Sequence, residues 1–206
     1  KVYFSKHFYQ HRYDYREEWI KLSKKIAELD SLDDLSSLIV TTMANIVDST
    51  AGGLWVKNNK GDYYLTAELN LTEHNKKVVY KNEPLIEFLS SKPWVVDFVE
   101  YFNDPDIYAG LLLDQWYAEL EDIWLIIPLF QKNSLDGFVV LTQPRVSRQI
   151  DWEDHDLLKT TGMQLANALA LTQISEDLSR ARQFEAYNRF SAFLVHDLKN
   201  LVAQIS

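Results

Sequence analysis

The stretch from Asp151 to the end of the chain constrains the fold most, because it reads as helix and contains no Pro and no Gly after Gly162. Asp151 is a suitable N-cap, and Asp154 follows three residues later as an imperfect capping-box partner, since Glu or Gln is usual there. Acidic residues in a first turn also suit the helix dipole. We therefore predict one helix that begins after Asp151 and continues to the chain end.

This predicted helix has three parts that differ in composition. Its first part carries a broad apolar face that can lie on a sheet. The middle part, from Glu176 to Arg189, is polar and indicates a solvated or coiled connector. Apolar residues then return at Phe190, Phe193, Leu194, Leu198, Leu201 and Ile205.

Two nearly continuous apolar runs before the helix predict a pair of central strands. Ile123 to Gln131 is expected to be a buried strand, Ser134 to Gly137 a turn, and Phe138 to Thr142 the returning strand. Earlier in the chain, Leu54 to Val56 and Tyr63 to Leu69 flank an Asn/Gly turn and predict a second hairpin.

The remaining elements are predicted from apolar spacing. Helices are expected from Glu17 to Leu29, from about Ser31 to Val47, and from Pro84 to Ser91. A β-like piece is expected at Trp94 to Val99. The order of these elements predicts a sensor-type α/β sandwich (fold class α+β), for which the PAS and GAF folds are the two alternatives.

Composition excludes several classes of function. A net charge of −9 and a pI near 5.0 argue against nucleic acid as a partner, because binding phosphates requires clustered Lys and Arg. The absence of Cys excludes a disulfide scaffold, a catalytic thiol and a thioether-linked chromophore. No apolar run approaches the roughly 18 residues that a membrane-spanning helix needs. We expect no membrane contact by these residues, and we expect no metal, since His7 and His11 have no third ligand nearby.

The central strands carry a first family resemblance. Trp124-Leu-Ile-Ile-Pro-Leu-Phe, a short turn, and Leu135-Asp-Gly-Phe-Val-Val-Leu resemble the paired central strands of GAF domains. The resemblance covers roughly Ser31 to Ile174. It implies an antiparallel sheet flanked by helices, followed here by a long C-terminal helix that enters a dimeric helical bundle.

The end of the chain carries a second resemblance. Phe190-Ser-Ala-Phe-Leu-Val-His196-Asp197-Leu-Lys-Asn200 resembles the H-box of sensor histidine kinases. On a helix the apolar residues around His196 form a seam, and His196 falls off that seam, where a phosphate donor can reach its imidazole. Leu201 stands where many H-boxes have Pro, which removes the usual kink.

The resemblance implies a role for each polar residue of this segment. His196 is the phospho-acceptor, with neutral imidazole as the nucleophile. Asp197 takes the second imidazole proton and holds the tautomer. Asn200, one helical turn after His196, orients the water for dephosphorylation of the partner receiver.

The two chain ends together resemble one narrower group. Three segments resemble the exosortase-associated (PEP-CTERM system) sensor histidine kinases. They are Phe4-Ser-Lys-His-Phe-Tyr, Tyr13-Asp-Tyr-Arg-Glu-Glu-Trp and Val195-His-Asp-Leu-Lys-Asn-Leu-Val-Ala-Gln-Ile-Ser. This implies a longer parent, anchored in the bacterial inner membrane, whose cytoplasmic portion contains this chain. It also implies a homodimer, a response-regulator receiver as partner, and a downstream domain that uses ATP and Mg²⁺.

The sequence divides accordingly into four parts. We expect an aromatic lead-in and helix over 1–30, a GAF-like sensor domain over 31–174, a helical connector over 175–189, and the start of the phosphotransfer helix over 190–206. No Gly-rich nucleotide loop occurs in these residues. The chain is therefore expected to lack kinase activity alone and to hold no cofactor.

Aromatic residues crowd the region where GAF domains close over small molecules. They are more often core or dimer contacts than ligand contacts. The candidate ligand-binding residues are Trp94, Phe98, Tyr108, Trp116 and Trp124.

A rival interpretation is a non-catalytic GAF module that binds a ligand or dimerises the chain. A free-standing hydrolase has no nucleophile and base to support it. An ATP-binding domain after Ser206 in the parent would favour the kinase, and an unrelated output domain would favour the rival.

Overall fold

A short helix over 19–27 and eleven further helices and strands are defined in the described part of the chain. The computed structural model describes residues 19–29, 31–71, 77–108, 111, 123–146 and 149–205, the segment 195–205 as helical backbone. A short helix over 19–27 comes first. The elements that follow are α2 (Leu32–Ile46), β1 (Gly52–Lys57), β2 (Tyr63–Leu69), β3 (Val78–Val79), α3 (Pro84–Ser91), β4 (Val96–Asp97), α4 (Phe98–Asn103), the 3₁₀ helix η1 (Pro105–Tyr108), β5 (Ile123–Gln131), β6 (Ser134–Thr142) and α6 (Trp152–Ile205).

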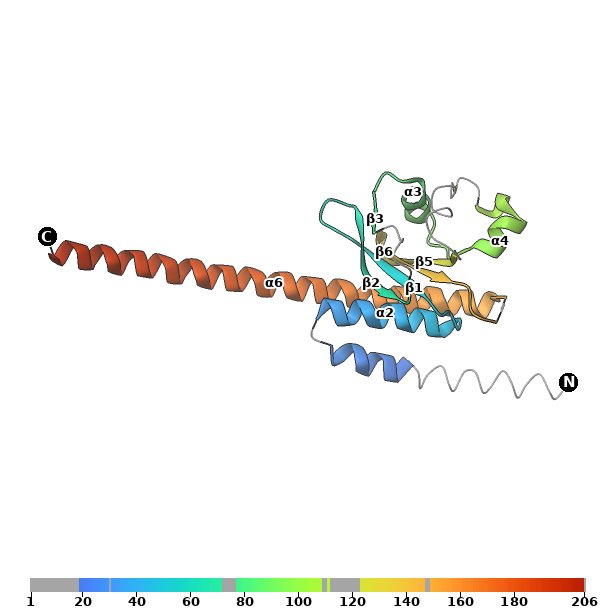
Figure 1. Ribbon diagram of the computed structural model, residues 1–206, viewed down its shortest axis with the longest axis horizontal. Coiled ribbons are helices and arrows are strands. Elements are labelled where there is room, and N and C mark those ends of the chain that lie inside the picture. The colour runs from blue at the N-terminus through green and yellow to red at the C-terminus, as the bar shows by residue number, and fades with distance from the viewer. Residues whose placement is uncertain are drawn as a thin grey trace.

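The strands form one antiparallel sheet of six strands in the order β3-β2-β1-β6-β5-β4. The two hairpins predicted from the sequence, β1–β2 and β5–β6, lie side by side through the β1–β6 pair. In Figure 1, α2 and the first part of α6 lie together on one face of the sheet, and α3 and α4 lie over the other. The predicted α+β sandwich is therefore confirmed.

Both faces of the sheet are buried, which explains why its central strands are apolar without interruption. One layer, the helix-side core, lies between the sheet and α2 and α6, and includes Leu54, Ile127 and Val139. The other, the α3-side core, includes Trp55 and Phe138, whose rings stack with centroids 5.5 Å apart. Since successive strand residues point to opposite faces, the longer strands β1, β2, β5 and β6 each supply both cores.

The start of α6 is fixed by a reciprocal capping box. The backbone N–H of Asp154 donates to Asp151 Oδ1 at 2.9 Å, and the backbone N–H of Asp151 donates to Asp154 Oδ2 at 3.1 Å. The shorter Asp side chain thus does what Glu or Gln usually does. The prediction of a helix that begins after Asp151 is confirmed, and α6 continues without a break to Ile205.

Helix α6 leaves the domain at Glu176. Its side chain accepts a hydrogen bond at 2.9 Å from the backbone N–H of Leu32, the first residue of α2. From Asp177 to Phe190 every residue is exposed. Figure 1 shows this part of α6 projecting away from the domain. At a rise of about 1.5 Å per residue, its length through Ile205 is roughly 40 Å.

Two sequence predictions are corrected here. The β5–β6 turn is not Ser134 to Gly137: Gln131 pairs with Ser134, so the turn is Lys132 and Asn133, with a left-handed φ of 55° at Lys132. The expected β-like piece at Trp94 to Val99 contains only the two-residue strand β4, after which Phe98 begins α4. The cause is the side chain of Asp97, which caps α4 by accepting from the backbone N–H of Val99 at 2.8 Å.

Candidate functional site

The segment with the H-box resemblance lies on α6. The backbone of His196, Asp197 and Asn200 is helical and continuous with the helix that packs on the sheet. Their side chains lie outside the described part of the structure. The roles assigned to these three residues therefore stay predictions.

The projecting part of α6 carries large apolar side chains in the open. Residues of this kind on a single helix indicate a missing partner surface, because an isolated apolar row in water is unfavourable. In the projecting part those more than two-fifths exposed are Leu178, Phe184, Tyr187, Phe190, Phe193 and Leu194, and just before it Leu171 and Ile174 are exposed as well.

The four described candidate ligand-binding aromatics do not all meet in one pocket, although Trp94 and Tyr108 line the same hollow. Phe98 and Tyr108 are buried in the α3-side core, whereas Trp124 is buried in the helix-side core, across the sheet from them. Trp94 is 46% exposed on the surface. Trp116 lies outside the described residues.

The aromatic residues near α4 pack against one another. The ring of Phe98 lies 6.3 Å from that of Tyr101, and the ring of Tyr108 lies 6.3 Å from that of Phe88 and 6.0 Å from that of Tyr101. Such separations are typical of aromatic pairs in cores. These side chains pack in the α3-side core, and Tyr108 also lines a hollow on the surface.

A buried polar network joins β4, α4 and η1. The Tyr108 hydroxyl donates to Glu100 and accepts from the backbone N–H of Asp97 at 3.2 Å. Burial raises the pKa of the Asp97 carboxyl, hydrogen bonds from the backbone of Val99 and Glu100 offset part of that rise, and the charge of His155 offsets some more. Burial and the bond to Glu100 also raise the pKa of Tyr108.

The raised pKa of Asp97 predicts a pH-dependent stability. As pH rises from the ordinary carboxyl value of 3.8 toward the raised one, unfolded chains lose the proton before folded chains do, so the free energy of unfolding falls. Asp97→Asn keeps an oxygen that can accept from Val99 and should remove this fall. Urea unfolding of both proteins from about pH 4 to about pH 7 measures it, and parallel curves would refute the prediction.

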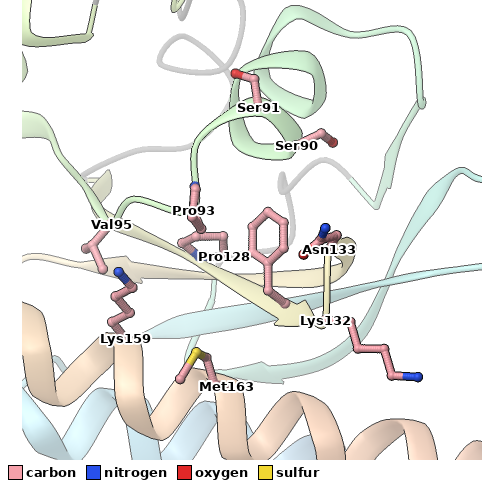
Figure 2. A pocket seen from close by; sticks show the side chains of 10 residues that line it. Ser90, Ser91, Pro93, Val95, Pro128, Lys132, Asn133, Lys159 and Met163 are labelled. Carbon is pink, nitrogen blue, oxygen red and sulfur yellow. The ribbon is translucent and has the colours of Figure 1, made fainter.

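Two adjacent hollows lie where α6 meets the segment between α3 and β4. The first, about 380 Å³, is shown in Figure 2 and lies between the end of α3, the β5–β6 turn and α6. The second, about 540 Å³ and more open, is lined by Trp94, Tyr108 and Trp152, among others. Lys159 lines both. Sequence reasoning missed the first hollow, because its lining residues are ordinary surface types from four separate segments.

Comparison with known proteins adds to this geometry. No family model and no curated protein sequence matches the chain. Solved structures do match. The GAF domain of a phosphoenolpyruvate-protein phosphotransferase from Coxiella burnetii has a TM-score of 0.58 and 18% identity, over 76% of this chain and 93% of that one. The fold is GAF-like.

Two further solved structures share the GAF-like fold. A GAF domain/HD domain protein from Geobacter sulfurreducens has a TM-score of 0.57 and 13% identity, over 72% of this chain and 98% of that one. Residues 122 to 287 of a methyl-accepting chemotaxis protein have a TM-score of 0.57 and 13% identity, over 74% and 97%. The GAF part of the recognition made from the sequence is thereby confirmed at the level of fold.

Two other features, a membrane-spanning helix and a metal site, are absent from the described residues. In residues 19–205, apart from the undescribed stretches, no helix is long and apolar enough to cross a bilayer. The same residues contain no group of three or more His, Asp or Glu side chains placed to hold a metal ion.

Proposed function

We propose that this chain is the sensory and phospho-accepting portion of a two-component sensor histidine kinase. The observation that carries the proposal is the single helix α6, which packs against the sheet of the GAF-like domain and reaches His196 without a break. The chemotaxis protein with the same fold supports a sensory role, since its description places the fold in a signalling receptor. The proposed location is the cytosol, below a membrane-anchored part of the parent.

In this proposal the projecting half of α6 pairs with that of a second copy. Its exposed apolar residues, from Leu178 to Leu194, would be covered in a two-helix contact. Two i,i+4 ion pairs, Arg180 with Glu176 and Arg189 with Glu185, lie on the same stretch and support its helical conformation. Dimerisation would bring two phospho-acceptor segments together in one bundle.

The chemistry assigned to the end of α6 needs three groups. The neutral imidazole of His196 attacks the γ-phosphorus of ATP, the bond to the bridging oxygen breaks, and ADP leaves. Asp197 accepts the other imidazole proton in a hydrogen bond, which keeps the attacking nitrogen unprotonated. Asn200 orients a water for the later dephosphorylation of a receiver domain. ATP and Mg²⁺ would be bound by a downstream domain of the parent.

The test is phosphorylation of the parent protein with ATP labelled at the γ-phosphate. Wild type should acquire label that is lost in acid and kept in base, and His196→Gln should acquire none. His155→Gln is the matched control, because it removes another histidine of α6 without touching the acceptor segment, and it should label like wild type. Equal label on wild type and His196→Gln, or none on either, would refute the proposal and favour a non-catalytic GAF module.

A further inference from the structure

The first hollow has the chemistry of a binding site for an anion. Lys132, Asn133, Lys159 and Ser90 line it, and each has a side chain that can donate hydrogen bonds. Among the described residues no carboxylate lines it, although the chain as a whole has a net charge of −9. A cationic hollow on an acidic protein is therefore a local departure from the surrounding electrostatics.

The two lysines have no partner for their charges among the described residues. Within the described residues neither Lys132 nor Lys159 makes an ion pair or a side-chain hydrogen bond. In Figure 2 the side chain of Lys159 extends from α6 toward Val95 and Pro128, whereas that of Lys132 stands at the rim and extends outward. Lys159 is thus the cation inside the hollow, and Lys132 is one that can approach an entering anion.

Apart from Ser91, whose hydroxyl donates to the backbone carbonyl of Phe88, the rest of the described lining is apolar. Pro93, Val95, Pro128 and Met163 provide walls on opposite sides, from the α3–β4 segment, from β5 and from α6. Its volume of about 380 Å³ lies within the usual range for small-molecule sites. A ligand that satisfies both parts of this lining bears one anionic group and one compact apolar group.

We propose that this hollow binds a small organic carboxylate, with the carboxylate on Lys159 and the apolar group against Pro93, Pro128 and Met163. The neighbouring hollow is lined by Glu100 and Asp156, whose carboxylates repel an anion and so direct it to the first hollow. This site is separate from the buried aromatic residues near α4. The proposal does not depend on phosphorylation at His196.

The position of the site on α6 gives it a consequence. Lys159 and Met163 lie in the second and third turns of the helix that continues to His196. A bound carboxylate would therefore contact, at one time, the end of α3, the β5–β6 turn and the helix that leaves the domain. Signal input to the domain would act on α6 directly and would not have to pass through the sheet.

Fluorine NMR of para-trifluoromethylbenzoate with this chain tests the proposal. The benzoate resonance should broaden in a saturable way, and the uncharged analogue para-trifluoromethylbenzamide should bind at least about tenfold more weakly, because it lacks the charge-assisted contact. Lys159→Gln should weaken benzoate binding by about tenfold. Lys25→Gln, which removes an exposed lysine on the helix over 19–27, should leave it unchanged.

Each alternative result has a definite meaning. Equal binding of the substituted benzoate and benzamide would show that the hollow recognises the apolar group alone, and would overturn the proposal. An equal loss of benzoate affinity in Lys159→Gln and Lys25→Gln would show that only the net charge matters, and would overturn the proposal. Unchanged affinity in Lys159→Gln would show that the benzoate binds elsewhere. No broadening at about 10 mM benzoate would overturn the proposal as well. Circular dichroism of each variant checks that the fold is unchanged.

Discussion

Trp124→Ala is expected to lower the free energy of unfolding by about 3–5 kcal/mol. Trp124 is 1% exposed and lies in the helix-side core, in the central strand β5. Truncation removes a large apolar side chain and leaves a cavity that strands held on both sides by hydrogen bonds cannot close. Urea unfolding followed by fluorescence and circular dichroism measures the loss.

Trp94→Ala is the control for that experiment. Trp94 is 46% exposed, and its ring lies 5.3 Å from the Lys92 ammonium, a cation–π contact of the weak, solvent-exposed kind. Its loss should cost less than about 1 kcal/mol. If Trp124→Ala proved as mild as Trp94→Ala, the placement of Trp124 in the core would be wrong.

Gly137→Ala is expected to cost about 1–3 kcal/mol, a large effect for one added methyl group. A Cβ at this position would lie 2.6 Å from the carbonyl oxygen of Trp55. Trp55 belongs to β1, which is paired on both sides in the middle of the sheet, so relief requires the β1–β6 pair to shift. Thermal and urea unfolding should both report the loss.

Gly162→Ala is the matched substitution in a helix. Its Cβ would lie 3.4 Å from Met43 Cε and 3.5 Å from Leu129 Cδ2, which are ordinary contacts with the ends of side chains. Because Ala favours a helix over Gly by about 1 kcal/mol, this variant should be as stable as wild type or more so. If Gly162→Ala had a lower free energy of unfolding than Gly137→Ala, the packing described for β6 and α6 would be wrong.

Patterns with a clear period allowed the larger elements to be predicted. The apolar runs of β5 and β6, the Asn/Gly turn between β1 and β2, and the long stretch after Asp151 each determine a local structure almost alone. Gly137 misled the prediction of the β5–β6 turn, because a glycine that allows close approach of two strands looks in sequence like one that allows a turn. The start of α4 could have been found from Asp97 and Glu100, which have capping-box spacing.

The sequence does not show which face of the sheet each residue of the central strands points to, and this affected the prediction of the ligand-binding residues most. Where both faces of a sheet are buried, apolar residues no longer alternate with polar ones, so the sequence does not show which face a residue joins. A register shift between Ile123 and Leu125 removes even the simple parity count around Trp124. The hollow beside Lys159 depends on four segments that meet only in the folded chain.

Because α6 is unbroken, the number of residues in the connector sets both the distance and the angle of His196 relative to the domain. Between Glu176, where the domain last holds the helix, and His196, each residue turns the helix by about 100° and advances it by about 1.5 Å. One residue more or less would carry His196 to another side of the helix, while seven would return it close to the same side, two turns further along. Substitutions of exposed connector residues should leave this angle unchanged, whereas insertions or deletions in the connector should change it.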